Sequence, residues 1–194
     1  MQLKLLHLSF LVLGLGSVLK AELPALVAAP ISGVFDTLKF GDDRETVLTK
    51  LKASKVVELM TDETFIGRSG LNGVFRCRKK VGSLGASLYF DWTASGKLKE
   101  INLQTESVSE ADYETVVRQS WRDLIDLLGE LNGEPAVKGS MPSRSSLRDG
   151  VFSPSHLWRL DAGGGILLGT AQDGNRFQVV VRFTSQSVQP LAIP

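Results

Sequence analysis

The chain has 194 residues, of which 43% are hydrophobic, 22% charged and 7% aromatic; this composition excludes a disordered or collagen-like chain and suits one domain or two small ones. The formal net charge of +1 provides no long-range field to attract nucleic acid, so we expect no nucleic-acid partner. No stretch after residue 21 is long and apolar enough to cross a bilayer, so we expect no transmembrane span.

The N-terminus has the pattern of a secretory signal peptide. A short positive stretch containing Lys4 precedes the apolar run Leu5–Leu15, which is about half as long as the roughly 20 residues that cross a membrane core. Small residues follow this run, and we expect cleavage after Ala21, with Ala28-Ala29 as the other candidate. The pattern predicts a signal peptide over residues 1–21 and export from the cytoplasm; an uncleaved N-terminal anchor is the alternative.

Cysteine usage indicates the kind of export. Cys77 is the single cysteine in the sequence, so no intramolecular disulfide can form. A eukaryotic secreted domain of this size usually carries several disulfides, and an acylated lipoprotein needs a cysteine directly after the apolar run. We therefore expect a periplasmic or secreted protein of a bacterial-type envelope.

A short helix is the first regular element that we expect with a clear pattern. Residues 22–33 are rich in proline and alanine and are predicted to form a flexible lead-in, followed by a short strand over 34–40. Asp42 and Glu45 have the spacing of a capping box. The residues after them present one apolar face, formed by Val47, Leu48 and Leu51. This pattern predicts a helix over 42–54.

The apolar period then changes from 3.6 to 2, which predicts an antiparallel meander. Three short strands are expected, at Val56–Leu59, Thr64–Ile66 and Val74–Arg78. The clearest hairpin pairs Leu84–Trp92 with Lys97–Leu103 through a four-residue turn. Its first strand alternates, with one face formed by Leu88, Phe90 and Trp92 and the other by Tyr89 and Asp91.

A long amphipathic helix is predicted over residues 110–131. Its apolar side chains recur at three- and four-residue steps and are Tyr113, Val116, Val117, Trp121, Leu124, Leu127, Leu128 and Leu131. Ser109 is the predicted N-cap, with Asp112 at the third helical position. Gly133 and Pro135 end the helix, since glycine permits a left-handed cap and proline cannot continue the helix.

The remaining chain is predicted to be a long polar loop followed by strands. Residues 136–150 are serine-rich and without periodicity, which is typical of a functional or mobile loop. Strands are expected at Leu157–Leu160, Ile166–Leu168 and Phe177–Phe183, where Gln178 and Arg182 point away from the apolar face. Asp173-Gly174 marks a tight turn, and residues 185–194 are expected to be a loose tail.

Together these elements predict an α+β fold with one or two antiparallel sheets, in a single domain over 34–184. The order suggests two helix-plus-meander units, over 34–105 and 106–184, with the long helix packed across a sheet face. An internal duplication is a hypothesis that this order raises.

The start of the first helix carries a resemblance to known families. Gly41, Asp42, Glu45 and Val47 match a helix start of the form G-x-[ST/D]-x-x-[ED]-V, which precedes an antiparallel meander. In this the chain resembles the BamE/SmpA-like and β-lactamase-inhibitor-protein-like folds. The chain departs from them in lacking a lipobox cysteine and cysteine pairs. The resemblance implies an exported protein whose sheet and loops bind another protein, and it assigns no residues.

A basic cluster is the candidate binding site in the sequence. Arg76, Arg78 and Lys80 fall on one strand face, where they would form a positive stripe for an anionic partner. The plainer interpretation is an edge strand that uses charge to prevent pairing with other strands. Both interpretations are open.

The chemistry-bearing residues favour a protein without enzymatic activity. Cys77 and His156, the one histidine after the predicted signal, are too few for a metal site, and we expect no cofactor. We therefore expect an exported non-enzymatic module for protein binding or cell-envelope assembly, with another exported or envelope protein as its partner. The alternative is a small exported hydrolase that uses carboxylates or a Cys77/His156 pair, in which nearby cations would activate the thiol.

Overall fold

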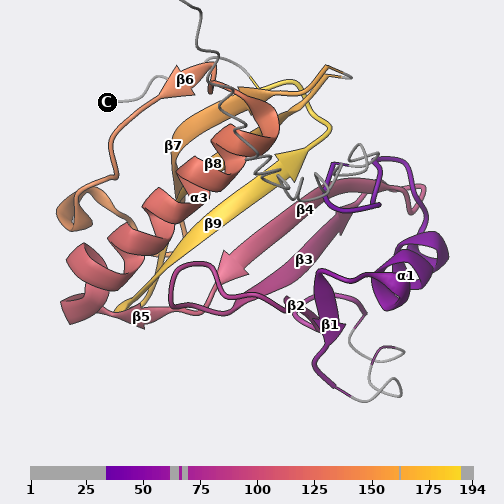
Figure 1. Cartoon of the computed structure of the whole chain (residues 1–194), viewed down its shortest axis with the longest axis horizontal. Helices are drawn as coiled ribbons and strands as arrows, with labels where there is room; N and C mark the ends of the chain where they lie inside the picture. Colours follow the sequence, from indigo (N-terminus) through magenta and orange to yellow (C-terminus); the bar gives the residue numbers. More distant parts are fainter. Residues whose placement is uncertain (1–33, 62–65, 67–69, 162, 189–194) are drawn as a thin grey trace, which may run out of the picture. The chain divides into compact units, whose positions relative to one another are not determined.

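One antiparallel sheet organises the computed structural model, which describes residues 34–61, 66, 70–161 and 163–188. Among these residues nine strands follow the order β1-β2-β3-β4-β9-β8-β7-β6, with β5 also paired to β9 (Figure 1). The predicted signal peptide and lead-in, residues 1–33, lie outside the described residues. All described residues belong to one compact unit, Ile31–Pro194, and the predicted α+β class with an antiparallel sheet is confirmed.

The elements fall into a first and a second half along the chain. The first half holds α1 (Arg44–Ala53), β1 (Val57–Leu59), β2 (Phe75–Cys77), β3 (Ala86–Trp92) and β4 (Leu98–Thr105). The second half holds β5 (Val108–Ser109), η1 (Glu110–Asp112), η2 (Tyr113–Val117), α3 (Arg118–Asn132), β6 (Val137–Lys138), η3 (Arg144–Ser146), β7 (Phe152–Arg159), β8 (Gly165–Asp173) and β9 (Arg176–Thr184).

In the first half of the chain, the cap of α1 and two predicted strands differ from the prediction. Asp43, and not Asp42, caps α1: its carboxylate accepts a hydrogen bond from the Thr46 backbone N–H at 2.9 Å. Asp42 instead accepts from the Lys39 backbone N–H at 2.9 Å and from Lys50 Nζ at 2.6 Å. Residues 34–40 form a turn closed by a single Phe35–Leu38 bridge, so the predicted strand is wrong. Of the strand predicted at residues 64–66 the structure describes Ile66 alone, which is helical.

The hairpin β3–β4 is confirmed. Leu88 and Phe90 pair with Leu103 and Ile101 across it, and all four side chains are buried. A bulge between Asp91 and Trp92 shifts the register at its end. Trp92 is therefore only half-buried and lies beneath the Arg44 guanidinium, 5.1 Å from the ring centroid.

The long helix forms where it was predicted, with a change of helix type along it. A 3-10 turn (η1) and a π-helical segment (η2) lead into α3, and Gly133 ends the helix with a φ of 75°. The Ser109 hydroxyl bonds the Asp112 carboxylate and caps no backbone N–H. Leu124 and Leu128 are buried, whereas Leu127 and Leu131 are 45% and 52% exposed. These two leucines lie roughly 60° further around the helix, beyond the surface that the sheet covers.

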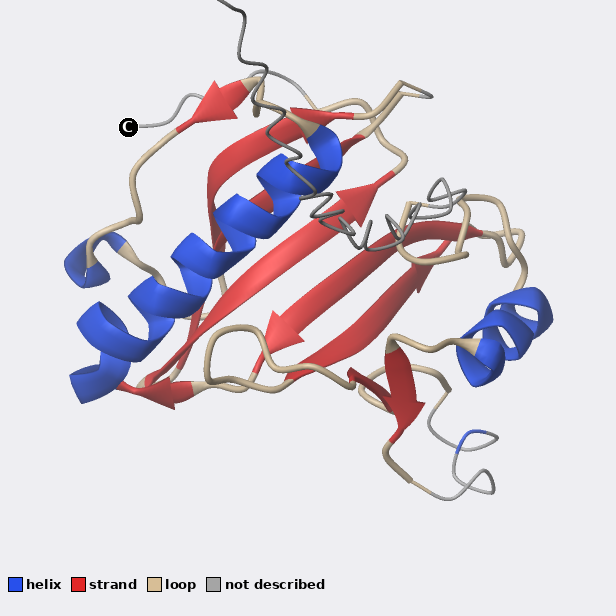
Figure 2. Ribbon diagram, viewed as in Figure 1, coloured by secondary structure: helices blue, strands red, loops and turns tan. Residues whose placement is uncertain are grey.

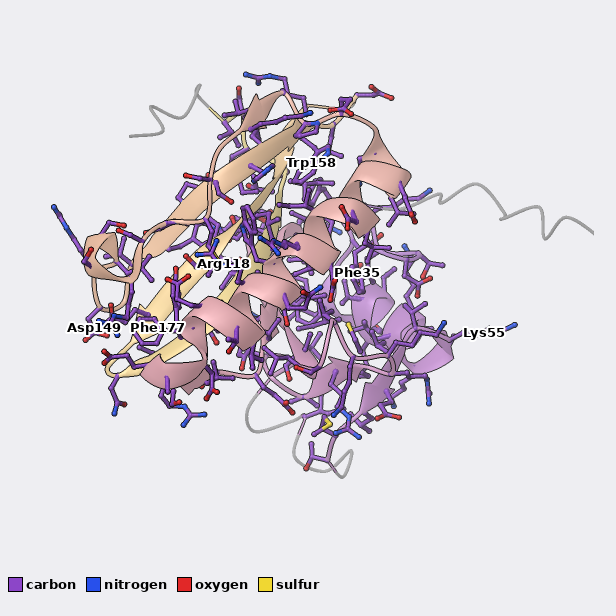
Figure 3. All side chains as sticks on the ribbon, turned by 60° about the vertical axis from the view of Figure 1, so that its left-hand side comes forward. Phe35, Lys55, Arg118, Asp149, Trp158 and Phe177 are labelled. Carbon is purple, nitrogen blue, oxygen red and sulfur yellow. The ribbon has the colours of Figure 1, made fainter. Side chains whose placement is uncertain are left out.

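The helix and the sheet enclose the main core. In Figures 1 and 2, α3 lies diagonally across one face of β7, β8 and β9. Figure 3 places Phe177 near the start of this helix and Trp158 near its end. Tyr113 accordingly meets Phe177 edge-on, with ring centroids 5.1 Å apart, and the Trp158 indole N–H donates to the Gly133 carbonyl at 2.9 Å. The helix is thus fixed to the sheet at both ends.

The chain between α3 and β7 is more ordered than a mobile loop. It contains β6 and η3, and it buries Met141 and Leu147 against the core. Pro142 accepts a hydrogen bond from the Tyr113 hydroxyl at 2.8 Å through its carbonyl. Scattered apolar residues in a polar stretch therefore hold this segment in place.

Two meanders meet at the centre of the sheet. β1–β4 lie on one side and β9–β6 on the other, joined by antiparallel pairing of β4 with β9 at five positions. This junction brings together residues that are far apart in sequence. That the two units arose by duplication stays a prediction.

Candidate binding face

The side of the sheet opposite α3, here called the open face, is the candidate site. Side chains alternate along β9, so Phe177, Val179, Val181 and Phe183 face the core. Gln178, Val180 and Arg182 therefore face the other side. Their cross-strand neighbours continue this face through Tyr89 on β3, Asn102 and Gln104 on β4, Ala171 on β8 and Phe152 on β7.

A shallow hollow of about 330 Å³ lies on the open face. Val180 and Ala171 form part of its apolar lining, and Phe152 contributes an aromatic ring. The polar residues that line it are Glu100, Asn102, Gln104, Gln172, Asp173, Gln178 and Arg182. A polar rim around a small apolar area is suited to holding one or two side chains of a larger partner.

An ion pair stands at one end of this hollow. Arg182 donates to both carboxylate oxygens of Glu100, from Nε at 3.1 Å and from the terminal nitrogen at 2.8 Å. The Asn102 amide adds a third hydrogen bond to Glu100 at 3.0 Å, and the Arg182 guanidinium lies 5.5 Å from the Phe152 ring centroid. Glu100 is only 8% exposed, so these contacts replace the water that a buried carboxylate loses.

The side-chain amides keep unused hydrogen-bonding capacity. Each amide offers two N–H donors and a carbonyl acceptor. The Gln178 side-chain nitrogen lies 3.5 Å from the Gln104 side-chain oxygen, which is at the outer limit for a hydrogen bond. The hollow therefore offers uncharged donors and acceptors beside the exposed Asp173 carboxylate, because its buried carboxylate, Glu100, is already paired.

The C-terminal tail bounds the open face. Ser185 bonds the Lys99 carbonyl through both its backbone N–H and its hydroxyl at 3.0 Å, and Arg159 donates to the Val188 carbonyl at 3.5 Å. Residues 185–188 are thus attached to the sheet, although a loose tail was expected; residues 189–194 lie outside the described part.

The predicted basic cluster lies outside the hollow, although Arg76 belongs to the open face, because it pairs with Ser87 of β3, which pairs with Gln104. Arg76 on β2 and Arg78 just after it both contact Glu58 of β1, at 2.7 Å and 3.3 Å. β2 is not an edge strand, because β1 covers it, so the edge-protection interpretation is wrong. Lys80 is exposed beyond the end of β2. None of the three lines the hollow, and their binding role stays a prediction.

Cys77 and His156 are not brought together. Cys77 is on β2 and His156 on β7, with four strands between them, a separation of roughly 24 Å at about 4.8 Å per strand. Burial raises the pKa of the Cys77 thiol to about 11, opposite to the lowering that an activated thiolate requires. The proposed nucleophilic pair is therefore excluded by the geometry.

We expect Cys77 to react slowly with thiol reagents. A rise of the Cys77 pKa from 9.0 to about 11 lowers the thiolate fraction at pH 8 by roughly a hundredfold. The more basic thiolate is about tenfold more nucleophilic, which offsets part of the loss in reaction rate. Native protein should thus react with a chromogenic disulfide at least about tenfold more slowly than urea-unfolded protein. A native rate equal to the unfolded rate would contradict the burial of this thiol.

The residues that the structure describes offer neither a metal site nor a membrane-spanning helix. They contain no group of three or more histidine, cysteine, aspartate or glutamate side chains placed to hold a metal ion. No helix among them is long and apolar enough to cross a membrane.

Comparison of the chain with protein-family models, with curated proteins and with solved structures finds no match. The geometry of the open face therefore carries the functional argument.

Part of the open face was visible in the sequence, and part was missed. The alternation in Phe177–Phe183 had already placed Gln178 and Arg182 away from the core. Glu100 and Phe152 were not singled out, because their roles depend on Arg182, which lies on a strand distant in sequence. An informative signal would have been an isolated arginine in an otherwise apolar central strand, since such a charge requires a partner.

Proposed function

We propose that this chain is an exported, non-enzymatic module that binds another exported or cell-envelope protein through its open face. The observation that carries the proposal is a shallow, largely polar hollow on one sheet face, opposite a face that α3 and the core cover. A rigid sheet can present such a surface with little loss of conformational freedom on binding, which favours affinity.

The hollow also indicates the chemistry of the partner. Glu100 and Arg182 neutralise each other, and the remaining groups include the amides of Asn102, Gln104 and Gln178. A polar loop that bonds these amides and places an apolar side chain on the partly exposed Phe152 and Ala171 would match this surface. Binding of that kind depends weakly on ionic strength, unlike binding through exposed charges.

The sheet edges are less suited to binding than the face. β1 has three residues and β6 has two, so each offers few backbone groups for an added strand. β7, next to β6, contains Pro154 and a bulge between Pro154 and His156. Proline lacks a donor and a bulge interrupts the ladder, and both features discourage strand addition.

Export and the family resemblance belong to the same proposal. The signal-peptide pattern over residues 1–21 supports delivery to the periplasm or to the outside. The helix-plus-meander resemblance to BamE/SmpA-like and β-lactamase-inhibitor-protein-like folds supports a sheet that binds protein. N-terminal sequencing of the protein recovered from cells tests the export step separately, with cleavage after Ala21 as the expected result.

A photo-crosslinking comparison tests the binding face. A benzophenone amino acid placed at Gln178, on the open face, is expected to give one discrete crosslinked protein in intact cells, equally in low and high salt. The matched position is Glu130, which is exposed on α3 and should give no such product. Crosslinking from Glu130 but not from Gln178 would place binding on the helix side and contradict the proposal.

A further inference from the structure

A buried serine joins α3 to the sheet at the β7 bulge. The Ser155 hydroxyl oxygen accepts a hydrogen bond from the Trp121 indole N–H at 2.9 Å and lies 3.1 Å from both the Leu168 carbonyl and His156 Nδ1. A carbonyl can only accept, so the single serine proton must go to Leu168. His156 Nδ1 must therefore carry a proton and donate it to Ser155. This assignment leaves Nε2 of the neutral ring as the site for a second proton.

His156 is enclosed by rings and faces one cation. Trp121 of α3 meets its ring edge-on at 5.3 Å, and Trp158 stacks on it at 5.8 Å. On the neighbouring strand β6, Lys138 is paired in register with His156. The Lys138 side chain forms a salt bridge with Glu134. α3 contributes the Trp121 indole and β8 contributes Leu168 here, and Lys138 is the charged group that acts on this ring.

The neutral ring is the form that the folded protein favours. His156 is 5% exposed, and burial together with the Lys138 charge lowers the pKa of His156 below its ordinary value of 6.5. The stacked indole would favour the imidazolium by a cation–π interaction. Burial and the Lys138 charge act in the opposite direction.

Strand β6 is held weakly at this position. It pairs with β7 at two positions, Val137 with Leu157 and Lys138 with His156. The Lys138 side chain is exposed and the Val137 side chain is half-buried, so little apolar area retains the strand. Movement of β6 away from β7 would separate the two cations that repel each other when His156 is charged.

We propose that His156 is an acid-sensitive latch that holds β6 on β7 while its ring is neutral and releases β6 when the ring gains a proton. Release exposes the backbone groups of β7 beside Leu157 as a new sheet edge, downstream of the bulge and Pro154. This device does not depend on the open face being a binding site.

The sign of the pH dependence follows from the native pKa. In the released state His156 keeps the Trp121 and Trp158 rings around it but loses the Lys138 charge, so its pKa is higher there than in the latched state. The latch is therefore fully stable above the pKa of His156 in the released state, weakens as the pH falls toward the pKa in the latched state, and weakens no further below it.

Two measurements on the full chain test the latch quantitatively. NMR titration of the ring protons gives the native pKa of His156, and hydrogen exchange gives the protection of the amides shared by β6 and β7. Protection should fall by at most about tenfold for each pH unit by which the native pKa of His156 lies below its pKa in K138Q, which lacks the Lys138 charge. Protection in H156Q should stay constant, because its amide can still donate to Ser155 but does not titrate.

A second variant keeps the test informative if H156Q folds poorly. K138Q changes an exposed side chain, and it should raise the native pKa of His156 and reduce the loss of protection by the matching factor. Constant protection in the wild-type protein across the His156 titration overturns the proposal. An equal loss of protection in a folded H156Q would overturn it as well.

Discussion

Replacing Gly169 with alanine is expected to destabilise the protein by about 3 kcal/mol or more. A Cβ atom at this position would lie 2.2 Å from the Ser153 carbonyl oxygen and 2.7 Å from Pro154 Cα. Both are backbone atoms of β7, so no side-chain rotation can relieve the clash, and β7 would have to move away from β8. Urea unfolding followed by circular dichroism measures the change.

Gly129 provides the matched control for this substitution. It lies within α3, and a Cβ there would meet nothing within 4 Å. G129A should therefore stabilise the protein by roughly 0.5–1 kcal/mol through helix propensity. If G169A instead changed the free energy of unfolding by less than about 1 kcal/mol, well below the usual effect of overpacking, the close approach of β7 to β8 would be refuted.

Removing Arg182 is expected to have the second large effect. R182M leaves the buried Glu100 carboxylate with only the Asn102 hydrogen bond, and loss of one partner of a buried pair costs about 3–5 kcal/mol. The Arg182 side chain is itself 36% exposed, so we expect a value near about 3 kcal/mol. The double variant E100Q/R182M, which has no unpaired charge, should recover most of that loss.

Arg76 offers the comparison for an exposed ion pair. It contacts Glu58 at 2.7 Å with a side chain that is 47% exposed, and R76M should cost less than about 1 kcal/mol. Unfolding measurements on the single and double variants give the coupling between Glu100 and Arg182. Strict additivity in E100Q/R182M would show that the two side chains do not depend on each other.

Periodicity predicted the elements well, and pairing between distant strands could not be predicted from it. The three- and four-residue spacing of Trp121, Leu124 and Leu128 identified α3, and the alternation at Leu88 and Phe90 identified β3. The partner of β4 was hidden, because any apolar strand could have paired with it; Glu100 and Arg182, the charges that mark the junction with β9, are 82 residues apart.

Local detail escaped prediction where two similar groups compete or where the period breaks. Asp42 and Asp43 both carry a carboxylate near the start of α1, and only the turn geometry decides that Asp43 caps it. The bulge after Pro154 changes which β7 side chains face the core. Sequence alternation alone therefore could not place Phe152 on the open face and His156 on the other.

The position of β9 has a consequence for how the chain folds. It is the last strand of the described chain, yet it lies at the centre of the sheet between β4 and β8. During synthesis the sides of β4 and β8 that pair with β9 stay open until this final strand emerges, so the sheet cannot close while the chain is growing. Such late, long-range pairing slows folding and leaves strand edges prone to aggregation, and a nascent chain of this protein would benefit from being held unfolded until it is complete.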